Sequence, residues 1–319
     1  MAKLYLGIDV SSRELVIAAF EDSRPLGRLP NTKADIQRWL KTLPAGCVLG
    51  MEATGTYHRL LADLAYGAGH TVYVLNPREV AQYLKSLRSR GKTDLIDARG
   101  IARYTHNETA DCHPYGPLSP AQQTIATLID RRAQVVKHRA SLKMSFSHTA
   151  LCDDKSFKDL LDAFHKFIAD IDLQLKRLRA ADAVLEQQCR RLSAIQGVGP
   201  LVSLVLAQRM NRTAYRNSDA LVAALGLDPR PRDSGQYCGR RHLSKRGNPE
   251  ERRLLYLAAV SACRNPTWRA IRDKLLAKGL PNTAAYCVIA RKILRIAFAI
   301  WHSDREFDIT KVGNACVAT

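Results

Sequence analysis

The stretch Leu4-Tyr5-Leu6-Gly7-Ile8-Asp9-Val10-Ser11 opens the chain with a short apolar run that carries an acid near its end. A run of this length is typical of a buried strand, and a carboxylate avoids burial unless it is paired. We therefore expect Asp9 at a strand end, where its side chain reaches solvent or a ligand. A second apolar run over residues 15–20 follows closely, so the two runs predict a hairpin.

Three further acids follow within the first hundred residues. Glu52 ends the apolar run Leu49-Gly50-Met51, and Asp94 and Asp97 are three apart, which puts them on one helical face. Four converging acids would repel one another unless cations neutralised them. Hard oxygen ligands suit Mg²⁺ or Mn²⁺, and two such ions activate a nucleophile and stabilise a leaving oxygen in phosphoryl transfer. Taken singly, each acid is equally typical of a helix cap, a salt bridge or a solvated face.

The order of the remaining elements predicts the fold class of this first region. A helix-like stretch over residues 57–64 follows the turn after Glu52, and a β-branched run over residues 71–77 is stopped by proline. The order β-β-(short β)-α-β-α-β-α predicts an α/β domain with a mixed sheet.

Length and charge favour a multidomain protein with a polyanionic partner. The chain has 319 residues, 49 Lys and Arg against 30 Asp and Glu, and a formal net charge of +19. Such an excess favours nucleic acid, because Lys and Arg neutralise phosphates with counterion release. No membrane span is predicted, since the apolar stretch over residues 293–301 is short and contains Arg295. A strand begins almost at once without a secretory leader, which predicts a cytoplasmic protein.

Eight cysteines are scattered along the chain without a C-x-x-C pair. This spacing argues against a zinc ribbon, and we expect reduced thiols rather than a disulfide framework.

The middle of the chain is predicted to be helical. Ser119 and Pro120 are a typical helix start, and one helix is expected from there to about residue 147. A second is expected over residues 156–191, after the charged break at residues 153–155. Two long amphipathic helices suggest an antiparallel arm for dimerisation or spacing, although an ordinary bundle within one domain explains the pattern equally well.

The C-terminal region contains a glycine turn that is typical of DNA-binding helix-hairpin-helix elements. Gly197 and Gly199 stand between two helical runs, and Pro200 suits the first turn of the second helix. Glycines let backbone amides approach phosphates closely, so both are candidate nucleic-acid contacts. A tight turn in a helical domain is the simpler alternative.

A long basic loop over residues 228–249 follows. It lacks apolar periodicity, and loops of this length in compact domains are usually functional or disordered. Ser234, between Asp233 and Gly235, is a candidate nucleophile, whereas the sequence pattern alone favours a turn. Basic residues that would hold phosphates follow it: Arg240, Arg241, Lys245 and Arg246.

Taken in order, these motifs resemble the DEDD transposases of insertion sequences, the Piv-like insertion-sequence one-ten family. The motifs are Gly-Ile-Asp9-Val-Ser, Met-Glu52-Ala-Thr-Gly, Lys-Thr-Asp94-Leu-Ile-Asp97, Ile195-Gln-Gly-Val-Gly-Pro and Ser234-Gly. The resemblance implies a RuvC-like domain of ribonuclease H fold over residues 1–112, a coiled-coil arm over 113–191 and a C-terminal transposase domain over 192–319. It also implies a structured bridge RNA that pairs with donor and target DNA.

The two lines of inference combine into one mechanistic hypothesis. Mg²⁺ held by the acids polarises a scissile phosphate, and Ser234 displaces a deoxyribose oxygen to form a phosphoserine link. The bond energy is kept, so that strands are resealed without ATP. Two cut sites on two duplexes favour a dimer or tetramer, acting on double-stranded DNA in the bacterial nucleoid.

Three alternatives from other classes remain. A RuvC-like, metal-dependent junction-resolving nuclease would use water as its nucleophile and leave Ser234 idle. The opening Gly-Ile-Asp-Val-Ser-Ser is also similar to the phosphate loop of sugar kinases and actin-like ATPases, but no second nucleotide signature follows. A non-catalytic nucleic-acid-binding protein would explain the charge alone.

Overall fold

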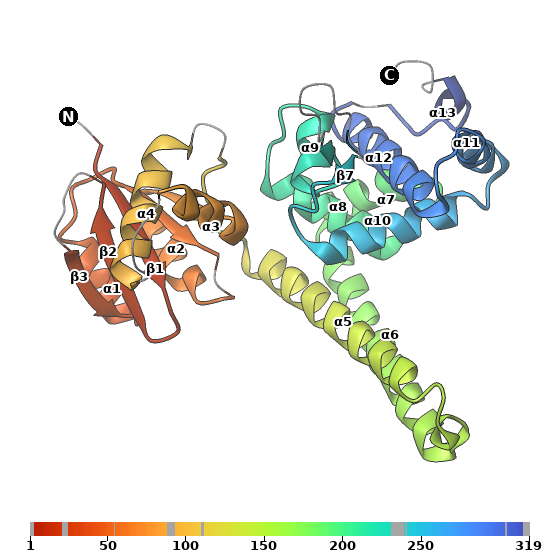
Figure 1. Ribbon diagram of the computed structural model, residues 1–319, viewed down its shortest axis with the longest axis horizontal. Helices are drawn as coiled ribbons and strands as arrows, with labels where there is room; N and C mark the ends of the chain where they lie inside the picture. The colour runs from red at the N-terminus through yellow and green to blue at the C-terminus, as the bar shows by residue number, and fades with distance from the viewer. Residues whose placement is uncertain are drawn as a thin grey trace. The chain divides into compact units, whose positions relative to one another are not determined.

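The computed structural model describes residues 3–20, 25–53, 55–87, 93–109, 112–230, 239, 241–303 and 305–314. The chain divides into two compact units, Met1–Leu118 and Ser119–Thr319 (Figure 1). The predicted boundaries of the arm at residues 113 and 191 stay predictions of the sequence.

Strands and helices alternate in the first unit, as the sequence predicts. Its strands are β1 (Tyr5–Val10), β2 (Glu14–Ala19), β3 (Pro25–Pro30), β4 (Val48–Glu52) and β5 (Thr71–Leu75). Its helices are α1 (Lys33–Leu40), α2 (His58–Gly67), α3 (Pro77–Ser86) and α4 (Asp94–Asn107). The strands form one mixed sheet in the order β3-β2-β1-β4-β5. The β1–β2 and β2–β3 pairs are antiparallel, and the β1–β4 and β4–β5 pairs are parallel. The predicted α/β class is therefore confirmed, and the strand order and directions agree with the ribonuclease H fold that the resemblance implies.

The two faces of this sheet are covered by different helices. Leu6, Ile8 and Met51 point to one face, where they pack with the buried side chains of α1 and α2. On the opposite face Val16 and Ala18 pack against Ala98 of α4, and α4 crosses this face in Figure 1. The alternation of side chains along each strand therefore sends a separate set of residues towards α4.

The second unit is mainly helical. Its helices are α5 (Pro120–Ser145), η2 (Ala150–Asp153), α6 (Lys155–Ala180), α7 (Ala183–Ser193), α8 (Pro200–Arg212), α9 (Ser218–Ala224), α10 (Pro249–Ala262), α11 (Pro266–Ala277), α12 (Asn282–Trp301) and α13 (Thr310–Asn314). β6 (Pro229–Arg230) and β7 (His242–Leu243) form a short antiparallel ladder. Apolar side chains from α7, α8, α10 and α12 form its core, together with the fully buried Trp268 of α11.

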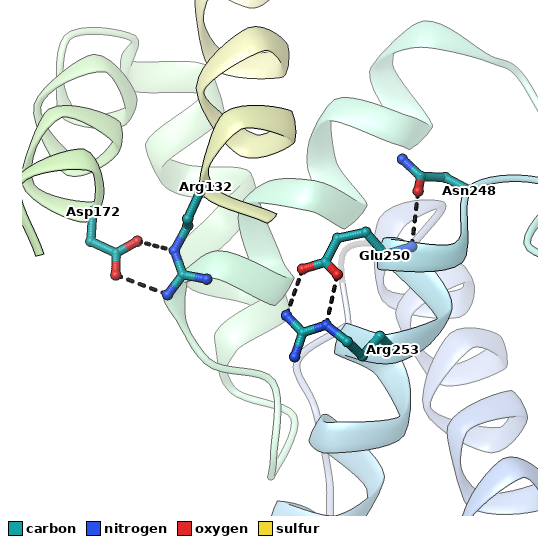
Figure 2. Close-up of polar contacts among 5 residues, drawn as sticks. All are labelled: Arg132, Asp172, Asn248, Glu250 and Arg253. Atoms are coloured by element: carbon teal, nitrogen blue, oxygen red, sulfur yellow. Dashed lines mark hydrogen bonds and ion pairs between the residues drawn. The ribbon is translucent and has the colours of Figure 1, made fainter. Parts of the chain in front are cut away.

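Helices α5 and α6 lie side by side as a hairpin within this unit (Figure 1). Arg132 of α5 donates two hydrogen bonds to the carboxylate of Asp172 on α6, at 2.6 and 3.0 Å (Figure 2). The first long helix is confirmed, with its end at Ser145. The single helix expected over residues 156–191 is wrong, because α6 ends at Ala180 and the Asp182 side chain caps α7 by accepting from the Leu185 amide.

None of the helices in the described ranges is long and apolar enough to cross a lipid bilayer.

Candidate active site

Asp9 and Glu52 lie on neighbouring parallel strands. Strands β1 and β4 pair in register up to Ile8 and Met51, and each acid is the next residue along its strand. Adjacent strands are roughly 4.8 Å apart, so the two backbones bring these carboxylates side by side. Both residues are partly buried.

Helix α4 touches the same face of the sheet through two glycines. A Cβ atom on Gly7 would lie only 2.1 Å from the Ala102 nitrogen, and one on Gly50 would lie 1.7 Å from the Thr105 Oγ1. Gly7 precedes Asp9 by two residues, and Gly50 precedes Glu52 by two, so each glycine shares a face with an acid. The acids therefore point to the side of the sheet that α4 covers.

The direction of α4 places its first turn at the acid end of the strands. The Tyr5 ring at the start of β1 contacts His106 at the end of α4, with ring centroids 4.8 Å apart. Asp94 and Asp97 therefore lie at the Asp9 end of β1. Thr93 caps this turn, since its side chain accepts from the Ile96 amide at 3.3 Å.

Arg28 links Asp94 to the sheet. In the strand register Asp9 is opposite Val16, and Val16 is opposite Arg28, so the three form one row across β1, β2 and β3. The Nη2 atom of Arg28 lies 3.6 Å from Oδ2 of Asp94, and its Nη1 donates to Glu14 Oε1 at 2.9 Å. The four predicted acids thus belong to elements that meet at one end of the sheet.

The oxygen atoms of the four carboxylates suit a divalent cation, but these side chains are not gathered around one point. Four carboxylates supply the hard oxygen atoms that Mg²⁺ and Mn²⁺ prefer. Among the described residues, however, no three acidic, histidine or cysteine side chains stand close enough together to hold a metal ion. The chemistry of the carboxylates and the common location of β1, β4 and α4 therefore suit a cation. The Asp94 carboxylate, however, pairs with Arg28.

Two residues at this end were not expected from the sequence. Arg28 is one, and Asn31 is the other, whose Nδ2 donates to the Ser11 carbonyl at 2.9 Å and to the Tyr57 carbonyl at 3.2 Å. Asn31 therefore ties the turn after β1 to the turn after β4. No motif marks either residue, and only the strand register would have found Arg28.

In the second unit the candidate glycine turn lies between α7 and α8. Gly197 has a φ of +86°, and a Cβ there would lie 2.1 Å from the Ala258 carbonyl oxygen of α10. The left-handed backbone agrees with the tight-turn alternative, and close packing on α10 is a second reason for a glycine here. Gly199 caps α8 ahead of Pro200, and a Cβ there would meet no atom within 4 Å. Nucleic-acid contact at either glycine stays a prediction.

The loop expected to carry the nucleophile is described at its two ends. Ser234 and Arg240 lie outside the described residues. Strands β6 and β7 close the base of the loop by pairing Pro229 with Leu243 and Arg230 with His242. The other predicted basic contacts lie beside or after β7 and are exposed, namely Arg241, Lys245 and Arg246.

The base of this loop is fixed by hydrogen bonds. The Ser244 hydroxyl bonds to the Asp228 carboxylate, and the Ser244 amide donates to the Asp228 carbonyl at 2.9 Å. Gly226 has a φ of +67° and packs directly on the backbone of Arg246. The Arg252 guanidinium of α10 donates to three carbonyls of this base, those of Leu225, Arg246 and Gly247.

Helix α10 begins directly after the loop. Asn248 caps it by accepting from the Glu250 amide at 2.9 Å, and the Glu250 carboxylate accepts two hydrogen bonds of 2.6 Å from Arg253 (Figure 2). Hydrogen bonds thus fix the start of α10 at the point where the loop ends.

Two charged side chains on the helices next to the base of the loop, Arg291 of α12 and Glu251 of α10, are partly buried. Burial lowers the pKa of Arg291 on α12, with a further lowering by the nearby Arg295 and an opposing effect of Asp228. Burial also raises the pKa of the Glu251 carboxyl on α10, against the opposing effect of Arg209, whose Nη2 lies 3.3 Å from Glu251 Oε2. These partly buried charges lie on the helices that carry the base of the loop.

Two family models match this chain. A DEDD model of IS110 elements, described as "Transposase", matches residues 6–150, and one described as "Transposase IS116/IS110/IS902 family" matches residues 189–272. The first range contains the four acids, and the second contains the glycine turn and the basic loop.

Similar proteins extend over most of the chain. The pilin gene-inverting protein of Moraxella bovis is 27% identical over 266 residues, which cover 81% of each chain. The transposase for insertion sequence element IS1328 of Yersinia enterocolitica is 24% identical over 333 residues, or 92% of this chain and 96% of that one. Among solved structures, RuvC of Thermus thermophilus matches with 18% identity and a TM-score of 0.27, covering 35% of this chain and 99% of that chain.

Proposed function

Because this chain belongs to the IS110 family of transposases, we propose that it cleaves and rejoins DNA at the ends of its own insertion sequence through a phosphoserine intermediate. The observation that carries the proposal is the common end of the sheet at which β1, β4 and the first turn of α4 meet. Relatives named for gene inversion and for transposition support DNA as the substrate. The site of action is the nucleoid in the bacterial cytoplasm.

Ser234 is the proposed nucleophile. Its Oγ forms a bond to the phosphorus and loses its proton, while the bond from phosphorus to a deoxyribose oxygen breaks and that oxygen takes up a proton. In the second step a freed deoxyribose hydroxyl attacks the same phosphorus and releases the serine. One phosphate ester replaces another at each step, so rejoining requires no ATP. The fixed base of the loop over residues 228–249 supports this role.

The four carboxylates of Asp9, Glu52, Asp94 and Asp97 are the proposed ligands of Mg²⁺ or Mn²⁺. When bound, such an ion supplies positive charge to the scissile phosphate and to the leaving oxygen. The protein contributes two strands that hold Asp9 and Glu52 side by side, and a helix held against them by backbone contact. Elements that pack this closely keep the carboxylates at a constant spacing.

The basic excess supports nucleic-acid partners. Arg240, Arg241, Lys245 and Arg246 would contact phosphates of DNA or of a structured bridge RNA that pairs with donor and target DNA. The amides at Gly197 and Gly199 are a second proposed phosphate contact. The formal charge of +19 favours such partners, because each neutralised phosphate releases counterions. The α5–α6 hairpin is the proposed contact between copies in a dimer or tetramer, with coiled-coil pairing as its form.

A denaturing gel tests the covalent step. Purified protein is incubated with Mg²⁺, RNA from the element's non-coding region and labelled donor and target DNA, using wild type, Ser234→Ala and Ser193→Ala. Ser193 is an exposed serine at the end of α7 and serves as the matched control. A labelled protein–DNA adduct is expected for wild type and Ser193→Ala and not for Ser234→Ala.

The second candidate is a metal-dependent, junction-resolving nuclease. The observation that favours it is the location of all four carboxylates in the first unit, so that water could attack without the loop of the second unit. This candidate predicts free cut ends and no adduct in wild type, with equal cutting by Ser234→Ala. Those results would overturn the phosphoserine step.

A further inference from the structure

An open hollow lies beside the acid end of the sheet. It is lined by residues 11–14, which form the turn after β1 and the first position of β2, and by residues 28–30 at the end of β3. All of these residues belong to the first unit, so the hollow does not depend on how the two units are arranged. Ser11 is two residues beyond Asp9, and Arg28 belongs to the same cross-strand row as Asp9 and Val16. The hollow therefore lies next to this row.

The turn that forms one wall is held by its own hydrogen bonds. The Ser11 hydroxyl oxygen accepts from the amides of Arg13 at 3.2 Å and Glu14 at 2.9 Å, and it donates to the Glu14 carbonyl at 2.9 Å. Asn31 bonds to the Ser11 carbonyl from the other side. The Arg13 side chain therefore extends from a fixed backbone, and this residue is exposed.

Two arginines, Arg13 and Arg28, line the hollow. Arg28 pairs with Glu14 and Asp94, but 56% of its side chain is exposed, as are 43% and 57% of the side chains of its two partners. Exposed ion pairs of this kind are weak and exchange readily. A phosphodiester can replace these weakly held carboxylates, because it too accepts two parallel hydrogen bonds from an arginine.

Position indicates which phosphate would bind. Arg28 stands two strands from Asp9 in the same cross-strand row, a separation of roughly 10 Å. The rise in duplex DNA is about 3.4 Å per nucleotide along the axis, and successive phosphates of one strand stand farther apart than this rise, so the distance spans at most about three nucleotides. A strand whose scissile phosphate lies at the carboxylates would therefore reach the hollow within about three nucleotides of the cut.

We propose that this hollow binds a backbone phosphate of the DNA strand that is cut, with Arg13 and Arg28 as its ligands. Arg28 exchanges its ion pair with Asp94 for the phosphate, so that binding of the strand leaves the Asp94 carboxylate available to a cation. The proposal rests on the proposed function for the identity of the strand. It requires no serine chemistry, since it concerns binding alone.

Binding of DNAs in which one phosphate at a time is replaced by a neutral methylphosphonate tests the proposal; this series is called the methylphosphonate walk. Element-end DNAs, each with one phosphate made neutral, are bound without metal to full-length protein in the Ser234→Ala background, and affinity is measured by fluorescence anisotropy. The variants are Arg13→Gln, Arg28→Gln, Arg28→Lys and the control Arg38→Gln. Arg38 is an exposed arginine of α1 that pairs with Asp35 at 3.1 Å, and α1 covers the face of the sheet opposite to α4.

One or two phosphates near the cut should be sensitive, with neutralisation lowering affinity about 5–10-fold, as expected for a charge-assisted contact. Arg28→Gln should abolish the sensitivity at one position only, and Arg28→Lys should restore part of it. The slope of log affinity against log salt should fall by about 0.9 for each arginine removed, against no change for Arg38→Gln.

An unchanged walk in Arg13→Gln and Arg28→Gln would overturn the proposal, as would sensitivity that appears only with RNA in place of DNA. A melting temperature measured for each variant excludes unfolding as the cause. Because the walk does not require cutting, its result is independent of whether wild type forms the serine adduct. The two proposals therefore fail separately.

Discussion

The Nη2 atom of Arg28 on β3 lies 3.6 Å from the Oδ2 atom of Asp94 in the first turn of α4. This pair joins the edge of the sheet to the helix that carries two of the four acids. Both side chains are more than half exposed, at 56% and 57%, so water screens the attraction. The pair therefore orients charge at the candidate site and contributes little to the stability of the fold.

A double-mutant cycle with Arg28→Gln and Asp94→Asn measures that contribution. We expect a coupling free energy of about 0–1 kcal/mol in urea unfolding, because exposed ion pairs rarely exceed this range. Both single variants should stay folded, which makes them usable in binding experiments. A coupling above about 2 kcal/mol would mean that the pair holds α4 in place.

The contact between α4 and the sheet is expected to be far more sensitive. Gly7→Ala places a Cβ 2.1 Å from the Ala102 nitrogen and 2.2 Å from the Ala98 oxygen, both of them backbone atoms that can move only with the helix. Overpacking of this kind costs about 1–3 kcal/mol, measured by chemical unfolding. The control is Gly67→Ala at the end of α2, where a Cβ meets no atom within 4 Å and no loss is expected.

Removal of one proposed metal ligand should affect both metal binding and strand cleavage. In wild type, Mg²⁺ at 100 times its dissociation constant should stabilise the fold by about 2.7 kcal/mol, and Asp9→Asn should lose most of this gain. Adduct formation should fall at least about 100-fold, since a lost cation contact costs several kcal/mol of transition-state stabilisation. Asp35→Asn in α1 makes the same charge change away from the four acids. Equal Mg²⁺ stabilisation in Asp9→Asn and wild type would remove Asp9 from the ligand set.

The second unit should lose stability as pH rises above the ordinary range of a glutamate. Burial raises the pKa of Glu251 above its usual 4.5, so the folded protein holds a proton that the unfolded chain has already released. The stabilising contribution is complete below about pH 4.5 and is lost as the pH rises through the raised pKa. Glu251→Gln should flatten the pH dependence in urea unfolding, and Glu306→Gln, at an exposed glutamate, should not. The same slope in both variants would contradict this assignment.

The order of strands and helices along the chain of the first unit, and the delivery of two acids to strand ends, could be predicted from the sequence. The apolar runs before Asp9 and Glu52 are short and bounded, and a pair of parallel strands brings its ends to one edge. The spacing of Asp94 and Asp97 correctly predicted a helical turn. These features are local, so a single sequence contains the information that fixes them.

Arg28 could not be found in this way because its location depends on register. The β2–β3 pairing shifts between Ile17 and Ala18, and the shift decides which residues of β3 lie opposite Val16. The break between α6 and α7 could not be predicted either, because it does not interrupt the apolar pattern of the sequence. Asp182 caps α7 within an apolar repeat that continues on both sides, because both helices pack on the same core. Gly197 has its close contact with α10, some sixty residues later in the chain.

Gly7 and Gly50 contribute no functional atom to the candidate site, yet they set the distance between the strands and α4. Gly7 packs directly on the backbone of α4 and Gly50 packs on the buried Thr105 side chain, so neither position has room for a Cβ atom. In a saturation mutagenesis screen for transposition, these two positions should tolerate as few replacements as the four carboxylates. Such a screen would rank Gly7 and Gly50, which have no reactive groups, among the most restricted residues of the protein. Intolerance to substitution alone would therefore not separate the residues that react from those that set their spacing.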